Sequence, residues 1–328
     1  MGCKNMADCF VLRSFYINFA VEKNITYLSI TMRKIKSFII VLAAALTFAA
    51  CGTTETVPVT GRKHNISVSD EQVLSLANQE YQKYMSTAKK STNATQTAMV
   101  ERVGRNLASA VETYLKNNGY TSELKNLNWE FNLVQDKQVN AFCMPGGKIV
   151  VYEGLLPYTK NDAQLAIVLG HEIAHAVAKH SAEQLSKQQN QQIGTSILGS
   201  VLNSTVGNGV GDVASQVAGT YFSFRNLKYS RDNESEADHI GLIFAAMAGY
   251  DPREAIPFWK SMQQGGSSNT NDLFSDHPSD AKRIAALEKE MPEALKYYKA
   301  PTTTSTTKKT TTTKKKSSST KKKTTRRK

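Results

Sequence analysis

The sequence has little cysteine and no long hydrophobic run, and each absence excludes a class of protein. Four cysteines occur in 328 residues, at positions 3, 9, 51 and 143, with no close pair in the body of the chain. We therefore expect neither a disulfide framework nor a thiolate metal site. The apolar run 38–50 has 13 residues, whereas a membrane-spanning helix needs about 20.

An excess of positive charge is also absent from the body. The formal net charge is +13, yet the tail 301–328 contains nine Lys, two Arg and no acidic residue, and residues 1–50 are basic too. Between these ends, acidic side chains slightly outnumber basic ones. We therefore expect no nucleic-acid partner. The tail offers nothing to bury and should be disordered, although binding of its cations to an anionic surface is an alternative.

The front of the chain has the pattern of an export signal. Arg33, Lys34 and Lys36 precede the apolar run, which ends in Phe-Ala-Ala-Cys51. This resembles the bacterial lipoprotein signal, in which the cysteine is lipidated after cleavage, and a plain secretory signal is the alternative. We predict an exported protein, lipid-anchored to a bacterial membrane, with the outer membrane facing the periplasm as the expected location.

The predicted organisation has four parts. They are a leader (1–50, with Met32 as an alternative start), a lipid-anchored tether (51–66), a folded domain (67–300) and the tail (301–328).

The periodicity predicts an α+β fold, mostly helical, with a small antiparallel sheet. Ser69 and Gln72 form a capping-box pattern at the start of one helix, and Asn161 or Thr159 caps another. Further helices are expected at about 96–117, 232–249, from Pro252, and 279–298, with strands at 129–134, 140–144 and 148–152. The region 190–220 is expected to be a lid or helical hairpin, or to contact a membrane.

One helix contains the pattern His171-Glu172-Ile-Ala-His175. Residues four apart lie on the same side of a helix, so both imidazoles can reach one Zn²⁺. Glu172 lies about 100° around the helix, where it can accept a proton from a water molecule without binding the metal. An amphipathic helix with exposed histidines is the simpler interpretation, and a third ligand is needed to decide.

A second i/i+4 pair supplies that ligand. Glu234 and Asp238 lie on one face of the helix that begins near Asp232, and Glu236 points elsewhere. One carboxylate can complete a catalytic site with an open position. The other can hold the free ring N–H of a ligating histidine.

These segments resemble the zincin-type metallopeptidases of the family that includes the HtpX heat-shock protease, the CAAX prenyl endopeptidase and the mitochondrial Oma-type protease, and particularly their exported bacterial branch. The resemblance covers residues 56–295. It depends on PVTGRK (58–63), NAFCMPGGKIVVYEGLL (140–156), HEIAH (171–175), SRDNESEAD (230–238) and SDHPSDAKRI (275–284). Cys-Met replaces the expected Ala-Leu before Pro145-Gly-Gly.

The resemblance implies a zinc-dependent endopeptidase with one Zn²⁺ per chain and protein substrates in the cell envelope. It assigns Glu234 as the third ligand and Asp238 as the residue that orients a ligand histidine. It places His277 and Arg283 near the metal, where they can stabilise the oxyanion. A zinc-stabilised chaperone that binds envelope proteins without cutting them is the alternative function. The oligomeric state is not predicted.

Other residues have ordinary interpretations. Cys143 is expected to be a packing residue, and His64, His180 and His239 are expected to be polar residues outside the site, because His180 follows His175 by five positions. The strand that begins at Asn140 is either a plain buried strand or an edge strand that pairs with substrate.

Overall fold

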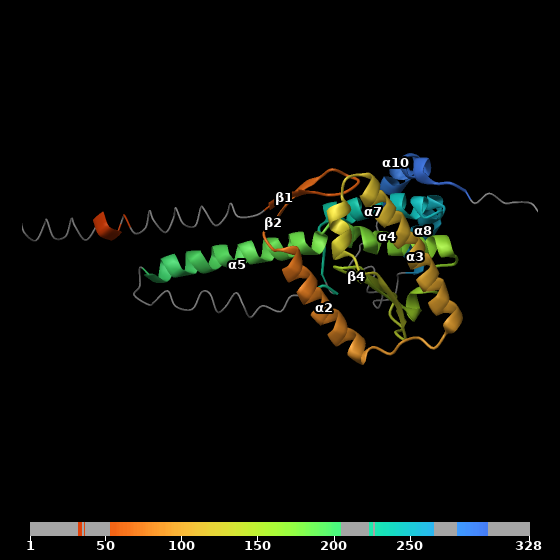
Figure 1. Cartoon of the computed structure of the whole chain (residues 1–328), viewed down its shortest axis with the longest axis horizontal. Coiled ribbons are helices and arrows are strands. Elements are labelled where there is room, and N and C mark those ends of the chain that lie inside the picture. The colour runs from red at the N-terminus through yellow and green to blue at the C-terminus, as the bar shows by residue number, and fades with distance from the viewer. Residues whose placement is uncertain are drawn as a thin grey trace, which may run out of the picture.

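A computed structural model describes residues 32–34, 36, 53–204, 223–225, 227–265 and 281–300 (Figure 1). The described body is mostly helical with two small sheets, so the predicted α+β class is confirmed. The strands are β1 (Thr53–Thr56), β2 (Lys63–Ile66), β3 (Glu130–Val134), β4 (Ala141–Met144) and β5 (Lys148–Tyr152). The α-helices are α2 (Asp70–Thr87), α3 (Ala94–Asn117), α4 (Asp162–Val177), α5 (His180–Ser204), α7 (Arg231–Met247), α8 (Ala255–Gly265) and α10 (Ala281–Tyr297).

The three-stranded sheet is mixed rather than purely antiparallel as predicted. Its order is β3-β5-β4, with β3 parallel to β5 and β4 antiparallel to β5. The turn at Pro145–Gly147 explains the β4–β5 hairpin, because Gly146 and Gly147 both have positive φ. The sequence contains no local signal for the parallel pairing, which the packing of the sheet determines. Strand β4 is left at an edge.

Apolar side chains cover both faces of this sheet. On one face the main core joins the sheet to α3, α4, α7, α8 and α10. On the other face a smaller cluster includes Val73 and Tyr81 of α2, Phe142 of β4 and Phe224. Strands β4 and β5 are therefore buried on both sides, which explains their largely apolar sequences. In β3, Glu130 and Asn132 are only partly buried.

The predicted helix starts are confirmed at two positions. Ser69 and Gln72 make the reciprocal capping-box hydrogen bonds of α2. Asn161, rather than Thr159, caps α4 by accepting a hydrogen bond from the backbone N–H of Gln164.

Most of the predicted tether is folded. Strands β1 and β2 pair antiparallel, with Thr53 opposite Ile66, and are joined by a turn at Pro58–Arg62. The side chain of Val57 is fully buried in the main core. Figure 1 shows this hairpin lying along the domain near the start of α5.

Two predictions fall partly or wholly outside the described residues. Residues 205–220 of the proposed lid and the segment that contains His277 are not described. The first part of the lid region belongs to α5, which extends away from the body in Figure 1. Within the described part of the chain, no helix combines the length and hydrophobicity needed to cross a membrane.

Candidate metal centre

Three side chains from two helices converge on one point. His171 and His175 come from α4 and Glu234 from the first turn of α7, and all three are buried. The Nε2 atoms of His171 and His175 are 3.1 Å apart. Each lies 3.4 Å from an oxygen of Glu234.

These separations fit a tetrahedral ion. With ligand bonds of 2.0–2.1 Å, neighbouring ligand atoms of a tetrahedral zinc site are about 3.3–3.4 Å apart. Two imidazole nitrogens and a carboxylate oxygen are also a donor set that zinc prefers. The three residues predicted as ligands therefore lie where one zinc ion could bind all of them.

Glycines at the crossing of α4 and α7 allow this convergence. A Cβ atom on Gly170 would lie 2.8 Å from the carbonyl oxygen of Gly241, and one on Gly241 would lie 2.8 Å from the backbone nitrogen of His171. Only glycine at both positions lets the backbones touch. The crossing lies immediately beside the first ligand.

Asp238 and Arg283 form a buried pair behind His171. Asp238 Oδ1 lies 2.9 Å from His171 Nδ1, so the ring donates there and leaves its Nε2 for the metal. Arg283 donates to both oxygens of Asp238, at 2.6 and 2.8 Å. The guanidinium also lies 3.6 Å from the ring centre of Trp259. Arg283 is thus bound to Asp238, and its Nη1 lies 3.9 Å from an oxygen of the ligand Glu234. Its contact with the oxyanion stays a prediction.

The surroundings of Asp238 and His171 shift the pKa values of both side chains towards their charged forms. Burial raises the pKa of Asp238, but Arg283 and His171 outweigh it and hold that pKa below its usual value. Burial lowers the pKa of His171, while hydrogen bonds to Asp238 and Glu234 raise it to about 9. Metal binding at His171 therefore competes with protonation of the ring.

Glu172 faces a small cleft on the other side of the ligands. The cleft is lined by Glu172, by Asn140–Cys143 at and before β4, and by Tyr229 and Phe224 across from them. Strand β4 pairs only with β5 among the described strands, and three of its four residues line this cleft. The predicted base and the predicted edge strand therefore lie together.

The Cys143 side chain lines this cleft yet is buried. Burial, followed by the charge of Glu172, raises the pKa of its thiol well above the usual value. A protonated thiol is a poor nucleophile, so the structure favours the packing role expected for Cys143.

His180 corrects the sequence analysis. We expected it away from the ligands, but its Nδ1 lies 2.9 Å from His175 Nδ1 and the side chain is buried. Helix α4 ends at Val177 and α5 begins at His180, with Lys179 between them at φ +54°. A helical count of five residues therefore does not apply across this turn.

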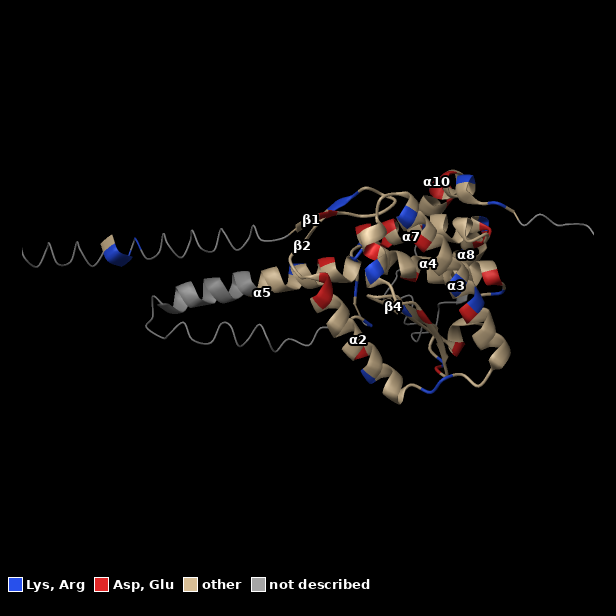
Figure 2. Ribbon diagram, viewed as in Figure 1, with Lys and Arg blue, Asp and Glu red and all other residues tan. Residues whose placement is uncertain are grey.

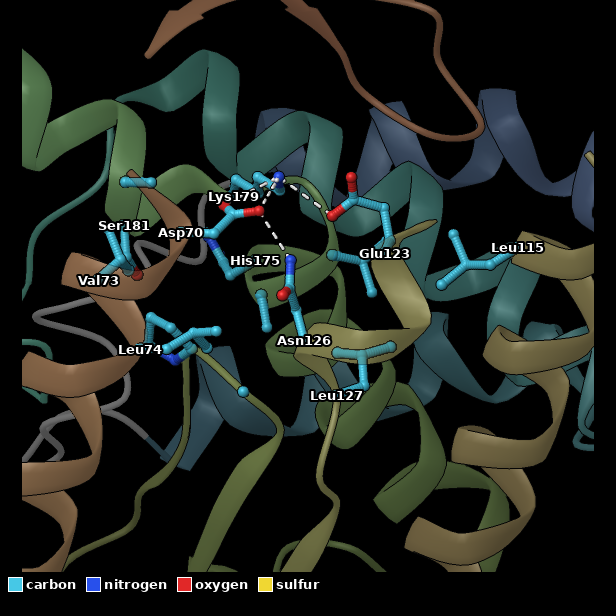
Figure 3. Close-up of a pocket in the computed structure, with 15 residues that line it drawn as sticks. Asp70, Val73, Leu74, Leu115, Glu123, Asn126, Leu127, His175, Lys179 and Ser181 are labelled. Atoms are coloured by element: carbon cyan, nitrogen blue, oxygen red, sulfur yellow. Dashed lines mark hydrogen bonds and ion pairs between the residues drawn. The ribbon is translucent and has the colours of Figure 1, made fainter. Parts of the chain in front are cut away.

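Ion pairs fix the turn itself. Lys179 Nζ lies 2.9 Å from a Glu55 oxygen and 3.1 Å from oxygens of Asp70 and Glu123. Figure 3 shows Lys179 meeting Asp70 and Glu123 at the rim of a pocket beneath the turn.

Sequence reasoning also missed Tyr229 and Glu236. The ring of Tyr229 stacks on His175 with centroids 4.0 Å apart. Glu236 does not point away into solvent: it is buried and lies 2.9 Å from His180 Nε2. The spacing of Glu234 and Glu236 gave no signal of this, because His180 comes from another helix. His239 instead pairs with Glu290 at 3.3 Å, outside the site.

A His-Glu-x-x-His helix whose two histidines meet a carboxylate from a second helix defines the zincin class of metallopeptidases. Residues 95–291 match the profile of peptidase family M48, and the chain belongs to that family. The family predicted from the sequence motifs is therefore confirmed, without distinction among its branches.

Three relatives illustrate the similarity. The mitochondrial metalloendopeptidase OMA1 of Arabidopsis thaliana is 41% identical over 182 residues, 55% of this chain and 35% of the relative. Human metalloendopeptidase OMA1 is 29% identical over 283 residues, 84% of this chain and 53% of the relative. The Escherichia coli beta-barrel assembly-enhancing protease is 26% identical over 161 residues, 48% and 33% respectively. The chain thus spans about a third to a half of these relatives' length.

Proposed function

We propose that this protein is a zinc-dependent endopeptidase that hydrolyses peptide bonds. The observation that carries the proposal is the position of Glu172, which follows the ligand His171 on α4 and lines a cleft together with Tyr229, whose ring stacks on His175. The membership of family M48 and the similarity to proteins named as metalloendopeptidases support it.

The residues of the chain have distinct roles in this proposal. A zinc ion held by His171, His175 and Glu234 would polarise the scissile carbonyl and lower the pKa of a water molecule. Glu172 accepts the proton of the attacking water and delivers it to the leaving amine. Asp238, held by Arg283, keeps His171 in the tautomer that ligation requires. His277, predicted to stabilise the oxyanion, lies outside the described residues.

The substrate backbone would bind along β4. An extended peptide can add to an edge strand through main-chain hydrogen bonds, and the free edge of β4 borders the cleft that contains Glu172. Such binding recognises backbone rather than one side chain, as an endopeptidase that cuts unfolded proteins requires.

We further propose that the substrates are cell-envelope proteins and that the enzyme is exported and anchored through a lipidated Cys51. The leader pattern at 33–51 supports this, and one relative, from Escherichia coli, is named as a protease that enhances β-barrel assembly. The similarity to mitochondrial enzymes gives no direct support for a lipid anchor. Replacing Cys51 with Ala should abolish incorporation of labelled fatty acid and release the protein from membranes, and an unchanged membrane fraction would contradict the anchor.

The chaperone alternative is less well supported. A purely structural zinc site usually has four protein ligands and needs no general base, whereas in the described part of the chain three candidate ligands meet and a buried glutamate follows the first of them.

Glu172→Gln tests the proposal. Glutamine has nearly the same shape but cannot accept the proton, so we expect zinc content to stay at one per chain and cleavage of casein to fall by about 10²–10⁴-fold. Metal analysis and a fluorescent casein assay, with and without chelator, measure both quantities. Cleavage at the wild-type rate by the variant would refute Glu172 as the base, and chelator-resistant cleavage by the wild type would refute a metallopeptidase.

A further inference from the structure

The outer ring nitrogens of the two histidine ligands contact different groups, and that of His171 lies beside the carboxylate of Asp238. For the second ligand, His175, the neighbour is another histidine. Nδ1 of His175 lies 2.9 Å from Nδ1 of His180. Nε2 of His180 lies 2.9 Å from Oε2 of Glu236. All three side chains are buried, and they come from three different helices.

This chain of contacts fixes the hydrogen positions. A carboxylate only accepts, so Nε2 of His180 carries a hydrogen and its Nδ1 accepts. Nδ1 of His175 must then be the donor, which leaves Nε2 of His175 with a lone pair for the metal. An imidazole between the carboxylate and the ligand thus selects the same tautomer that direct contact with a carboxylate would select.

The carboxylate at the far end is held by the β1–β2 hairpin. Arg62 Nε donates to Glu236 Oε2 at 2.7 Å, and Thr60 Oγ1 donates to Glu236 Oε1 at 2.5 Å. Both residues lie in the Pro58–Lys63 motif, which the proposed mechanism does not otherwise use. Arg62 also pairs with Glu183 of α5 at 2.8 Å, which connects the hairpin to the helix that carries His180.

The backbone of the hairpin is shaped to present these two side chains. Val57 donates to the Arg62 carbonyl at 2.8 Å and Gly61 donates to the Val57 carbonyl at 3.0 Å. Val59 and Gly61 both have positive φ, at 74° and 70°. A non-glycine residue in that region is uncommon and indicates a turn that its surroundings impose.

We propose that the β1–β2 hairpin is a positioning element of the metal centre, and that Arg62 and Thr60 hold Glu236 so that His180 orients His175 for metal binding. This inference rests on the proposed zinc site. It assigns positioning roles to Glu236 and His180, which we had expected to lie outside the site, and a function to a segment expected to be a tether.

Zinc affinity of the full-length chain tests this role. Outer partners of ligating histidines contribute about 10–100-fold to metal affinity, so Glu236→Gln should weaken zinc binding by that factor in competition with a fluorescent chelator. Arg62→Met should weaken it by less than Glu236→Gln, and Arg62→Lys should restore part of the loss.

Glu55→Gln is the matched control. Glu55 also joins the hairpin to the domain, through Lys179 at 2.9 Å, but among the described residues it contacts no member of the His175–His180–Glu236 chain. The zinc affinity of Glu55→Gln should equal that of the wild type. The absorption spectrum of the Co²⁺-substituted protein adds a readout of ligand geometry, which should change in Glu236→Gln and not in Glu55→Gln.

The outcomes separate the inference from the proposed function. The positioning role would be overturned if Glu236→Gln kept the zinc affinity and Co²⁺ spectrum of the wild type. It would also be overturned if Glu236→Gln and Glu55→Gln lost zinc affinity equally. Neither result would affect the proposed endopeptidase function. Absence of zinc binding and of cleavage in the wild type would overturn the proposed function. If the metal-free melting curve shows that Glu236→Gln does not fold, the variants Arg62→Met and Arg62→Lys decide, because the Arg62 side chain is one-third exposed (33%). Wild-type zinc affinity in Arg62→Met would then overturn the inference.

Discussion

Asp238 and Arg283 show how a buried charge can serve a neighbouring ligand. Both side chains are less than one-tenth exposed, and Asp238 contacts both Arg283 and His171. A buried ion pair contributes little net stability by itself, but removal of one partner leaves an uncompensated charge. The pair is therefore better explained by the orientation of His171 than by stability.

Asp238→Asn should lower both zinc affinity and stability. The amide cannot supply the negative charge, so Arg283 keeps a buried positive charge without its counter-ion, and unfolding should become easier by about 3–5 kcal/mol. Zinc binding should weaken by about 10–100-fold. Chelator competition and urea unfolding measure the two effects. Asp232→Asn, an exposed change in the first turn of the same helix, should alter neither, and a neutral result for Asp238→Asn would contradict its positioning role.

Sequence reasoning predicted the side-chain pairs that lie within one helix, but it missed the contacts between residues of different helices. The i/i+4 spacing was sufficient to select His171, His175, Glu234 and Asp238, since helical geometry alone places each pair on one face. His180 was missed because the left-handed Lys179 breaks the helical phase after Val177. Glu236 was missed because its partner lies in another helix.

Helices α4 and α7 meet through Gly170 and Gly241, and this contact sets the distance between the histidines and Glu234. A helix pair with ordinary side chains at the crossing is held 8–10 Å apart. Here the backbones themselves are in contact. Gly170 lies next to His171, and Gly241 lies about two turns after Glu234. The contact between the two glycines therefore brings the first turn of α7 beside the second half of α4.

Gly241→Ala should separate the two helices. The added methyl would meet the backbone of Gly170 and His171 at 2.8–3.0 Å, and backbone cannot rotate away as a side chain can. We expect a loss of stability of about 1–3 kcal/mol together with weaker zinc binding, measured by urea unfolding and chelator competition.

Gly104→Ala is the control for that change. A methyl there would collide with the ring of Phe131, in the core but away from the metal ligands. It should lower stability similarly while the folded protein keeps its zinc affinity. Equal losses of zinc affinity in both variants would show that the α4–α7 crossing has no special role.

The elements themselves were largely predictable, and their arrangement was not. Capping residues such as Ser69 and Asn161 mark helix starts by local hydrogen bonds. Strands β3 and β5 pair in parallel, and this pairing depends on how α2 and α3 cover the two faces of the sheet. No local pattern encodes that choice.

At the scale of the whole molecule, the N-terminal hairpin joins parts of the chain that are distant in sequence. Figure 2 shows acidic and basic residues interspersed along the ribbon of the described body. Glu183 of α5 brings several of these charges together, since it contacts Arg62 and Lys187 at 2.8 Å and His64 at 3.4 Å.

Glu183→Gln should reveal a pH-dependent part of the stability. Burial raises the pKa of Glu183, but His64, Arg62 and Lys187 outweigh burial and hold the pKa far below the ordinary value of 4.5. A depressed folded-state pKa stabilises the protein above the unfolded pKa, and this contribution is lost as the pH falls further. The wild type should therefore exceed the variant by roughly 2 kcal/mol at pH 7.

That difference should shrink below about pH 4.5, the ordinary value for the unfolded chain. Urea unfolding of chelator-treated protein between pH 3 and 7 measures it, with the exposed Glu101→Gln on α3 as control. A difference that is constant across this range would contradict the assigned ion pairs.

If Cys51 carries the proposed lipid anchor, the early start of β1 would limit how far the enzyme can act from a membrane. Strand β1 begins at Thr53, two positions after Cys51, and two residues of fully extended chain span only about 7 Å. An acyl chain on Cys51 would therefore keep the catalytic body close against the bilayer, without a spacer that lets it explore the surrounding compartment. Proteins stalled at the lipid surface would come within its reach, and freely diffusing ones would have to travel there first.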